Sequence, residues 1–361
     1  MLETRHSARR SGLLGRIAGL NPDRLRELSL LVLIALAVLV FSLLIEGYFS
    51  GRFFNRVSTG VAIIAVLAMA QTIVILTRNI DLSVGSIVGI AAYLTAELLV
   101  SVPALPAPLA VLVAVGIGSV LGALNGVLVA YGRVPSIVVT LGTLATYRSW
   151  LIDHGGAKTI TADTLPDWIV TFPQFTVATA GDLDIRLVVA IAIVVVIALQ
   201  LLFSRLRVAR YLYASGSNPA AAARSGLPIR RITLSAFIAS GALAGLAGFM
   251  FVARFGTVTP VAGTGLELQS VAAAVVGGVS TLGGSGTILG AVLGAVLIET
   301  LGASLIRMPA VSEFWRDAVL GILILLAIAA DFLVRRRLRQ LRGSTAVPGP
   351  VTVAQGVPDG A

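Results

Sequence analysis

Long apolar runs dominate this sequence, and a chain with so many of them is expected to fold in a lipid bilayer. Eight runs meet or nearly meet the roughly 20 residues that a helix needs to cross the hydrocarbon core of a bilayer. Only 12% of the residues are charged, against roughly 25% in an average soluble domain. The chain is therefore predicted to be an all-α polytopic membrane protein. The runs cover residues 28–49, 57–77, 82–102, 107–131, 187–204, 232–253, 286–306 and 318–334.

Two weaker runs, 135–152 and 266–279, decide the number of crossings. Basic residues in short loops favour the cytoplasmic side, and the arginines here concentrate in the N-terminal tail, in residues 205–231 and in residues 335–342. Only about ten spans, with both weak runs included, place all three segments on that side. Both termini are thus predicted to be cytoplasmic, and the net charge of +10 reflects topology rather than nucleic-acid binding. Whether the weak runs cross fully or are re-entrant stays open.

The pattern divides the chain into three parts. Residues 1–27 form a basic cytoplasmic tail, residues 28–334 the membrane domain, and residues 335–361 a Pro/Gly-rich cytoplasmic tail that is predicted to be disordered. The first apolar run is longer than the apolar region of a signal peptide, so it is expected to be an uncleaved helix.

The segment "RNIDLSVGS" at residues 78–86 places polar residues beside lipid-length helices. Non-helical backbone at membrane depth is tolerated when it is buried in protein or lines an aqueous cavity. Asp81 and Ser83 are predicted to cap a pore-side helix that begins near Val84, and Gly85 to allow close helix packing. The alternative is an ordinary loop and helix cap at the cytoplasmic face. Replacing Asp81 by alanine is expected to reduce transport more than assembly.

A second glycine-rich break, "VVGGVSTLGGSGTILGAVLGA", covers residues 275–295. Its glycines allow a tight turn followed by close helix packing. "GSIVG" in the first segment matches "GTILG" here, which indicates an internal repeat of the kind found in transporters. The candidates for the solute path or gate in this segment are Gly284, Ser285 and Gly286.

Ionisable residues within apolar spans are costly and are therefore functional candidates. Glu97 and Glu299 join the candidate path, with Arg148 and Arg254 as possible partners. The scarcity of charge in the spans favours a neutral, sugar-like solute over an anion or a metal ion.

Catalysis and metal binding find no support in the sequence. The chain has no cysteine and two histidines, so neither a thiolate nor a histidine metal site is expected. The glycine-rich "GVSTLGGSG" lacks the lysine of a phosphate-binding loop, because the only lysine is Lys158. We predict a transport protein that binds no cofactor and is not an enzyme.

Residues 205–231 form the longest predicted cytoplasmic loop. Asn218 can cap a helix that starts at Pro219, alanines follow, and Gly226 with Pro228 ends it. A short helix with a bare alanine face suits docking into a cleft on another protein. The alternative is a basic loop that only sets topology.

Five segments resemble, in the same order, the permease subunits of bacterial ATP-binding cassette importers for monosaccharides, the ribose, xylose, rhamnose and autoinducer-2 group. They are "RNIDLSVGSIVG", "GRVPSIVVTLGTLATYRS", "GSNPAAAARSGLPIRR", "GTGLELQSVAAAVVGGVSTLGGSGTILGAVLGA" and "FWRDAVLGILILLAIAADFLV". "LTRNID", "GTGLE" and "LGGSG" look more like the autoinducer-2 and rhamnose branch than the ribose branch.

The resemblance implies a channel made with a second copy or a paralogue in the bacterial inner membrane. It also implies an extracytoplasmic solute-binding protein and a separate cytoplasmic ATPase that hydrolyses the ATP. The family's coupling motif has the spacing E-A-A-x-x-x-G. Ala220, Ala221, Ala222 and Gly226 occupy that spacing after Asn218, with alanine at the acidic position.

Two other readings stay open. An ion-driven secondary transporter would work through Glu97 or Glu299, but it leaves the 205–231 loop unexplained. A membrane scaffold without transport would tolerate substitutions at Gly85 and Gly286.

Overall fold

The computed structural model describes residues 22–181 and 183–308, with scattered positions between 311 and 329. The part described is mainly helical, with one small hairpin. In chain order it contains α2 (Pro22–Leu44), α3 (Gly51–Leu76), α4 (Val84–Ser101), α5 (Ala107–Ala130), α6 (Ser136–Gly155), α7 (Asp167–Thr171), η1 (Phe172–Gln174), β1 (Thr176–Ala180), β2 (Leu183–Arg186), α8 (Leu187–Arg205), α9 (Arg207–Ser217), α10 (Pro219–Arg224), α11 (Ile229–Phe255), α12 (Leu266–Val276) and α13 (Ile288–Ile306).

Seven of the eight long apolar runs form helices that are long and apolar enough to cross a membrane, namely α2, α3, α4, α5, α8, α11 and α13. The eighth run, 318–334, falls where the structure describes only single positions. The prediction of a polytopic helical membrane protein is confirmed, whereas a count of ten spans is not established. The first helix begins at Pro22, earlier than expected, because proline is well suited to the first turn of a helix. The two predicted tails lie largely outside the described residues.

The two weaker runs have different structures. Helix α6 has 20 residues, but its threonines and Arg148 keep it outside the seven apolar helices. Helix α12 has 11 residues, and a helix of that length rises about 16 Å, roughly half of the hydrocarbon core. Residues 266–279 therefore do not cross as a single helix, and irregular backbone lies on both sides of α12.

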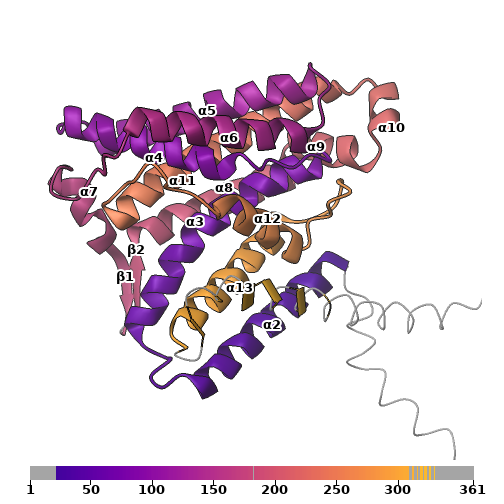
Figure 1. Ribbon diagram of the computed structural model, residues 1–361. Helices are drawn as coiled ribbons and strands as arrows, with labels where there is room; N and C mark the ends of the chain where they lie inside the picture. The colour runs from indigo at the N-terminus through magenta and orange to yellow at the C-terminus, as the bar shows by residue number, and fades with distance from the viewer. Residues whose placement is uncertain are drawn as a thin grey trace, which may run out of the picture.

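The centre of the fold is the crossing of α5 and α11, which approach at backbone distance. A Cβ atom built on Gly118 would lie 2.7 Å from the Gly245 nitrogen, and one built on Gly122 would lie 2.9 Å from the Gly241 Cα. In both helices the glycines are four residues apart, the small-residue spacing that lets membrane helices pack closely. This crossing holds α4 and α3 beside it, as Figure 1 shows.

The molecule has two distinct ends. Helices α9 and α10 lie at one end, here the loop end, and α7 with the β1–β2 hairpin lies at the opposite end, here the hairpin end (Figure 1). The hairpin is antiparallel, pairs Thr179 with Asp184, and has an irregularity between Thr176 and Ala178. The all-α prediction missed this hairpin because its strands are only five and four residues long.

Exposed apolar side chains cover the outer helices. Leu43 on α2, Leu112 on α5 and Val194 on α8 are each more than 60% exposed. In a soluble protein such a surface would be a liability, but a helix that faces lipid requires it. The buried polar residues gather instead around α3, α4 and α11.

Candidate functional site

The short helix predicted in the 205–231 loop is present as α10. The Asn218 side-chain oxygen accepts a hydrogen bond from the Ala221 nitrogen at 3.0 Å, so Asn218 is the cap. The helix ends at Arg224, and Gly226 follows with φ of +82°, a conformation that glycine adopts without strain. Ala222 is buried, whereas Ala220 and Ala223 are exposed. A surface of small side chains therefore faces outward at the loop end.

The loop is fixed to the rest of the protein through backbone groups of Gly216 and Ser217. The Arg78 side chain donates hydrogen bonds to the carbonyl oxygens of both residues, to that of Ser217 at 2.7 Å. The Gly284 nitrogen donates to the Leu76 carbonyl oxygen at 3.0 Å. We call the group Leu76, Arg78, Gly216, Ser217 and Gly284 the junction.

Gly216 is the tightest point of the junction. A Cβ atom at this position would overlap the Leu76 carbonyl oxygen and would lie 2.6 Å from the Gly284 nitrogen. Both neighbours are backbone atoms, so no side chain can rotate to make room. The end of α9, the turn after α3 and the second glycine-rich segment are thus in direct backbone contact.

The second glycine-rich segment forms the predicted turn. Gly283, Gly284 and Gly286 have φ values of +79°, +70° and +136°, which L-residues rarely adopt. The Ser285 carbonyl oxygen closes the turn by accepting from the Ser280 nitrogen at 2.9 Å, while the Ser285 side chain is exposed. Tyr213 of α9 donates to the Gly286 carbonyl oxygen at 2.8 Å, which ties this turn to the loop a second time.

Asp81 lies in a sealed polar cluster between α3 and α4. It is 0% exposed. Its Oδ1 accepts from the Ser83 nitrogen at 3.1 Å and from the Ser83 hydroxyl at 2.6 Å, and its Oδ2 accepts from the Ser240 hydroxyl at 3.3 Å. Burial raises the pKa of the Asp81 carboxyl above its ordinary value, and the hydrogen bonds from Ser83 and Ser240 oppose that shift.

The cluster continues into α3 and α5 through side chains that the sequence reading did not single out. The Gln71 side chain donates to the Asp81 carbonyl oxygen at 2.5 Å, and the Asn125 side chain donates to the Ser83 hydroxyl at 2.7 Å. Gln71, Asn125 and Ser240 are all 0% exposed. Each is a polar residue inside an apolar run, and that pattern could have identified them.

The start of α4 is partly as predicted. The helix begins at Val84, and Asp81 satisfies a free backbone nitrogen near its start. Ser83, however, makes no side-chain cap, because its hydroxyl donates to Asp81 instead. Since Asp81 and Ser83 are both fully buried, neither side chain lines an open passage in this structure.

Gly85 allows the predicted close approach, to the first turn of α12 and to the loop before it. A Cβ atom on Gly85 would overlap the Glu267 carboxylate and would lie 2.7 Å from the Gly263 carbonyl oxygen. The segment before α12 therefore enters the space between α4 and α6. Arg148 of α6 donates to the Ala262 carbonyl oxygen there at 2.5 Å and attracts Glu267 electrostatically.

The two acidic candidates lie in different surroundings. Glu97 is half-exposed and contacts His154 at 2.9 Å. It lies within the membrane-length helix α4, and its place on the solute path stays a prediction. Glu299 is half-buried on α13. It packs where a Cβ atom on Gly60 would overlap it, and it is attracted electrostatically to Arg254.

Comparison with known proteins places these features in a family. A family model described as branched-chain amino acid transport system, permease component, matches residues 53–328. The autoinducer 2 import system permease protein LsrC of Escherichia coli O9:H4 (strain HS) is 35% identical over 322 residues, covering 88% of this chain and 90% of the relative. LsrC of Yersinia enterocolitica is 35% identical over 332 residues, covering 90% and 88%. No solved structure matches the chain.

The family match covers most of the chain, and the relatives align over nearly their whole length. The expected resemblance to importer permeases is therefore confirmed. The match also agrees with the seven membrane-length helices. The chain belongs to this family of multi-pass membrane permeases, the transport subunits described as branched-chain amino acid transport system, permease component.

Proposed function

We propose that this permease imports a sugar or sugar-like solute, driven by a separate ATPase that docks on α10. The curated relatives are named as autoinducer 2 import permeases, which makes autoinducer-2 the first solute to test. Rhamnose and other monosaccharides are tested next, because the sequence motifs resemble those of monosaccharide importers. A branched-chain amino acid is also tested, because the family description names that class of solute.

The junction is the observation that carries the ATPase part of this proposal. Asn218, the cap of α10, directly follows Ser217, whose carbonyl oxygen is held by Arg78. A partner that displaced α10 would pull on this carbonyl, on the turn after α3 and on the turn before α13 together. The turn after α3 contains the buried Asp81 and Ser83, and the turn before α13 leads into the helix that carries Glu299.

The same proposal assigns the two ends of the molecule. The loop end carries the arginines of residues 205–231 and is cytoplasmic, as are both termini, because short basic loops stay inside. The hairpin end then faces an extracytoplasmic solute-binding protein. A second copy or a paralogue completes the channel in the bacterial cytoplasmic membrane, and ATP is hydrolysed by the partner.

Uptake in cells tests this proposal. The permease is expressed with its neighbouring ATPase and binding protein, and uptake of labelled autoinducer-2, rhamnose, ribose and leucine is measured. Replacing exposed Ala220 by arginine is expected to reduce uptake at least about tenfold, because a long charged side chain blocks close docking of α10. The permease should still reach the membrane.

Ala104 provides the matched control for that substitution. It is an exposed alanine in the turn between α4 and α5, at the opposite end of the bundle. Ala104→Arg therefore controls for the effect of an added arginine on membrane insertion and Tm, without touching α10. Uptake that survives Ala220→Arg contradicts docking at α10. Uptake that continues with an inactive ATPase contradicts ATP-driven import.

Glu97→Gln separates the ATP-driven mechanism from an ion-driven one. The Glu97–His154 pair is half-exposed, and such pairs contribute little stability. We expect uptake within about twofold of wild type, since a surface pair of this kind contributes about 0–1 kcal/mol. Uptake is measured with and without a proton uncoupler at constant ATP. A loss with both Glu97→Gln and the uncoupler would favour a secondary transporter.

A further inference from the structure

An arginine-lined cavity at the hairpin end shares only Arg254, the electrostatic partner of Glu299, with the site described above. It has a volume of about 490 Å³. A second cavity of about 450 Å³ adjoins it, shares Arg52 and Arg56, and adds Arg307. The first cavity is lined by Arg52, Asn55, Arg56, Thr59, Pro173, Arg186, Arg254 and Phe255.

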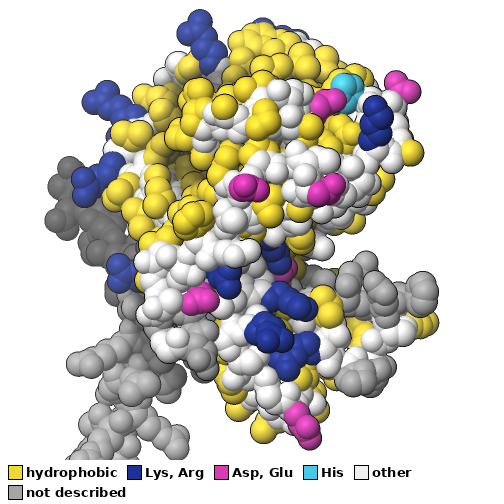
Figure 2. Space-filling model, turned by 90° about the vertical axis from the view of Figure 1, so that its left-hand side faces the viewer, with side chains coloured by type: hydrophobic (Ala, Val, Ile, Leu, Met, Phe, Trp, Pro, Cys, Tyr) yellow, Lys and Arg dark blue, Asp and Glu magenta, His cyan; other side chains and the backbone are white. Residues whose placement is uncertain are grey.

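Three segments bring these side chains together. Arg52, Asn55, Arg56 and Thr59 are spaced i, i+3, i+4 and i+7 along the start of α3, which places them on one helix face. Arg186 stands at the end of β2, and Arg254 is in the last turn of α11. Figure 2 looks onto this end and shows Lys and Arg side chains gathered near the centre of the lower half.

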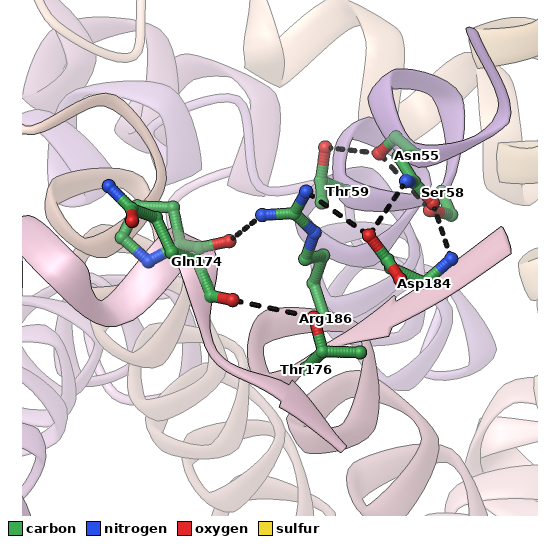
Figure 3. A network of polar contacts seen from close by, with 8 residues as sticks. Asn55, Ser58, Thr59, Gln174, Thr176, Asp184 and Arg186 are labelled. Atoms are coloured by element: carbon green, nitrogen blue, oxygen red, sulfur yellow. Dashed lines mark hydrogen bonds and ion pairs between the residues drawn. The ribbon is translucent and has the colours of Figure 1, made fainter. Parts of the chain in front are cut away.

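Two of the arginines are already held by protein groups. Arg186 donates to the Pro173 carbonyl oxygen at 2.6 Å and lies 3.5 Å from the Asp184 carboxylate. Asn55 donates to that same carboxylate at 3.4 Å, as Figure 3 shows. Arg254 donates to the Arg56 carbonyl oxygen at 3.4 Å and lies over the Phe255 ring. These contacts fix the walls of the cavity.

The remaining two arginines have no such contact. Among the described residues, the guanidinium groups of Arg52 and Arg56 have no hydrogen-bond acceptor and no ion-pair partner, and both side chains are exposed. They are four residues apart on one helix, where like charges repel. The nearby carboxylates are Asp184, which is shared with Arg186 and Asn55, and Glu299, which faces Arg254. The cavity therefore carries an excess of positive charge.

We propose that this cavity binds the carboxylate or phosphate group of a small polyhydroxyl solute. Guanidinium groups bind both oxyanions through paired N–H donors. Thr59 and Asn55 supply uncharged polar groups for hydroxyls, and the half-exposed Phe255 ring offers an apolar face. The volume is within the range of small-molecule sites. The binding itself does not depend on the proposed function, but its role as the solute's first contact does.

A solute with an oxyanion group differs from the neutral solute expected from the sequence. That expectation considered charge within the spans, and these arginines lie at or near span ends, where long side chains reach water. An anionic sugar derivative would be attracted to the hairpin end and would enter the protein there.

Binding is measured on the purified full-length permease in phosphatidylcholine nanodiscs, without ATPase, by the shift in Tm as sodium gluconate is added at constant ionic strength. Inorganic phosphate and neutral sorbitol are tested in parallel. We expect a saturable rise in Tm with gluconate or phosphate and none with sorbitol. The tighter of the two anions identifies the oxyanion group of the solute.

Two variants locate the binding. Arg56→Gln removes an exposed charge from both cavities and is expected to weaken binding about tenfold, the effect of one charged hydrogen bond. Lys158→Gln removes an exposed charge at the same end but outside the cavity, and it should leave binding unchanged. Equal Tm shifts for Arg56→Gln and wild type would overturn the proposal.

A lipid or a protein carboxylate could also meet these arginines. A Tm rise with phosphatidylglycerol nanodiscs, but not with gluconate or phosphate, assigns the cavity to lipid and overturns the proposal. A rise with the solute-binding protein alone overturns it in favour of docking. Failure of uptake in cells would contradict the proposed function. It would not affect the binding measured on the purified permease.

Discussion

Replacing Gly216 by alanine is expected to abolish measurable uptake and to lower the Tm of the purified permease. The added methyl group would overlap the Leu76 carbonyl oxygen and crowd the Gly284 nitrogen. Relief requires α9 to move away from α3, which breaks the Arg78 hydrogen bonds to Gly216 and Ser217. Overpacking of this kind costs about 1–3 kcal/mol, and the broken bonds add to that cost.

Gly142→Ala is the matched control, because a Cβ atom on Gly142 of α6 has no neighbour within 4 Å. Alanine in a helix is favoured over glycine by about 0.5–1 kcal/mol, so Tm should be unchanged or slightly raised. Thermal unfolding and uptake are measured for both variants. Wild-type uptake by Gly216→Ala would show that the junction can open without loss of transport.

The second large effect is expected for Asp81→Ala, as a loss of stability. The substitution leaves the Ser83 nitrogen, the Ser83 hydroxyl and the Ser240 hydroxyl without their acceptor. Each unsatisfied buried group costs about 1–3 kcal/mol. The free energy of unfolding should fall by several kcal/mol, about the sum of these terms, and less permease should reach the membrane.

Asp81→Asn tests whether Asp81 also has a role in transport. The amide keeps one acceptor oxygen at nearly the same volume, so it should recover most of the Tm lost in Asp81→Ala. Because the carboxyl is sealed from solvent, the structure favours a parallel loss of stability and uptake. That differs from the earlier expectation of a transport-specific effect. An Asp81→Asn variant with wild-type Tm but no uptake would instead support a specific role of Asp81 in transport.

Local features of the sequence predicted local structure well. The long apolar runs identified seven helices, Asn218 was recognised as the cap of α10, and the glycines at 283–286 indicated a turn. Each of these depends on residues within one or two helical turns of one another. Hydrophobic period, capping and backbone conformation are all encoded at that range.

Contacts between segments that are distant in the sequence could not be predicted from local sequence patterns. The Asp81 cluster includes Asn125, which is 42 residues from its partner Ser83, and Ser240, which is 159 residues from Asp81. Glu97 contacts His154 of α6, 57 residues away in the sequence, and the apolar run around Glu97 does not predict that contact. The arginine cavity combines α3, β2 and α11, which no single stretch of sequence predicts.

The backbone character of the junction has an evolutionary consequence. Arg78 binds carbonyl oxygens of the loop, and Gly284 binds a carbonyl oxygen of α3. Carbonyl groups are present whatever side chain a residue carries. Mutations on the outward face of α10 can therefore accumulate, and track changes in a partner, while the internal attachment of the loop is inherited intact. The exposed side chains of the loop can therefore change while its backbone contacts with the rest of the protein are kept.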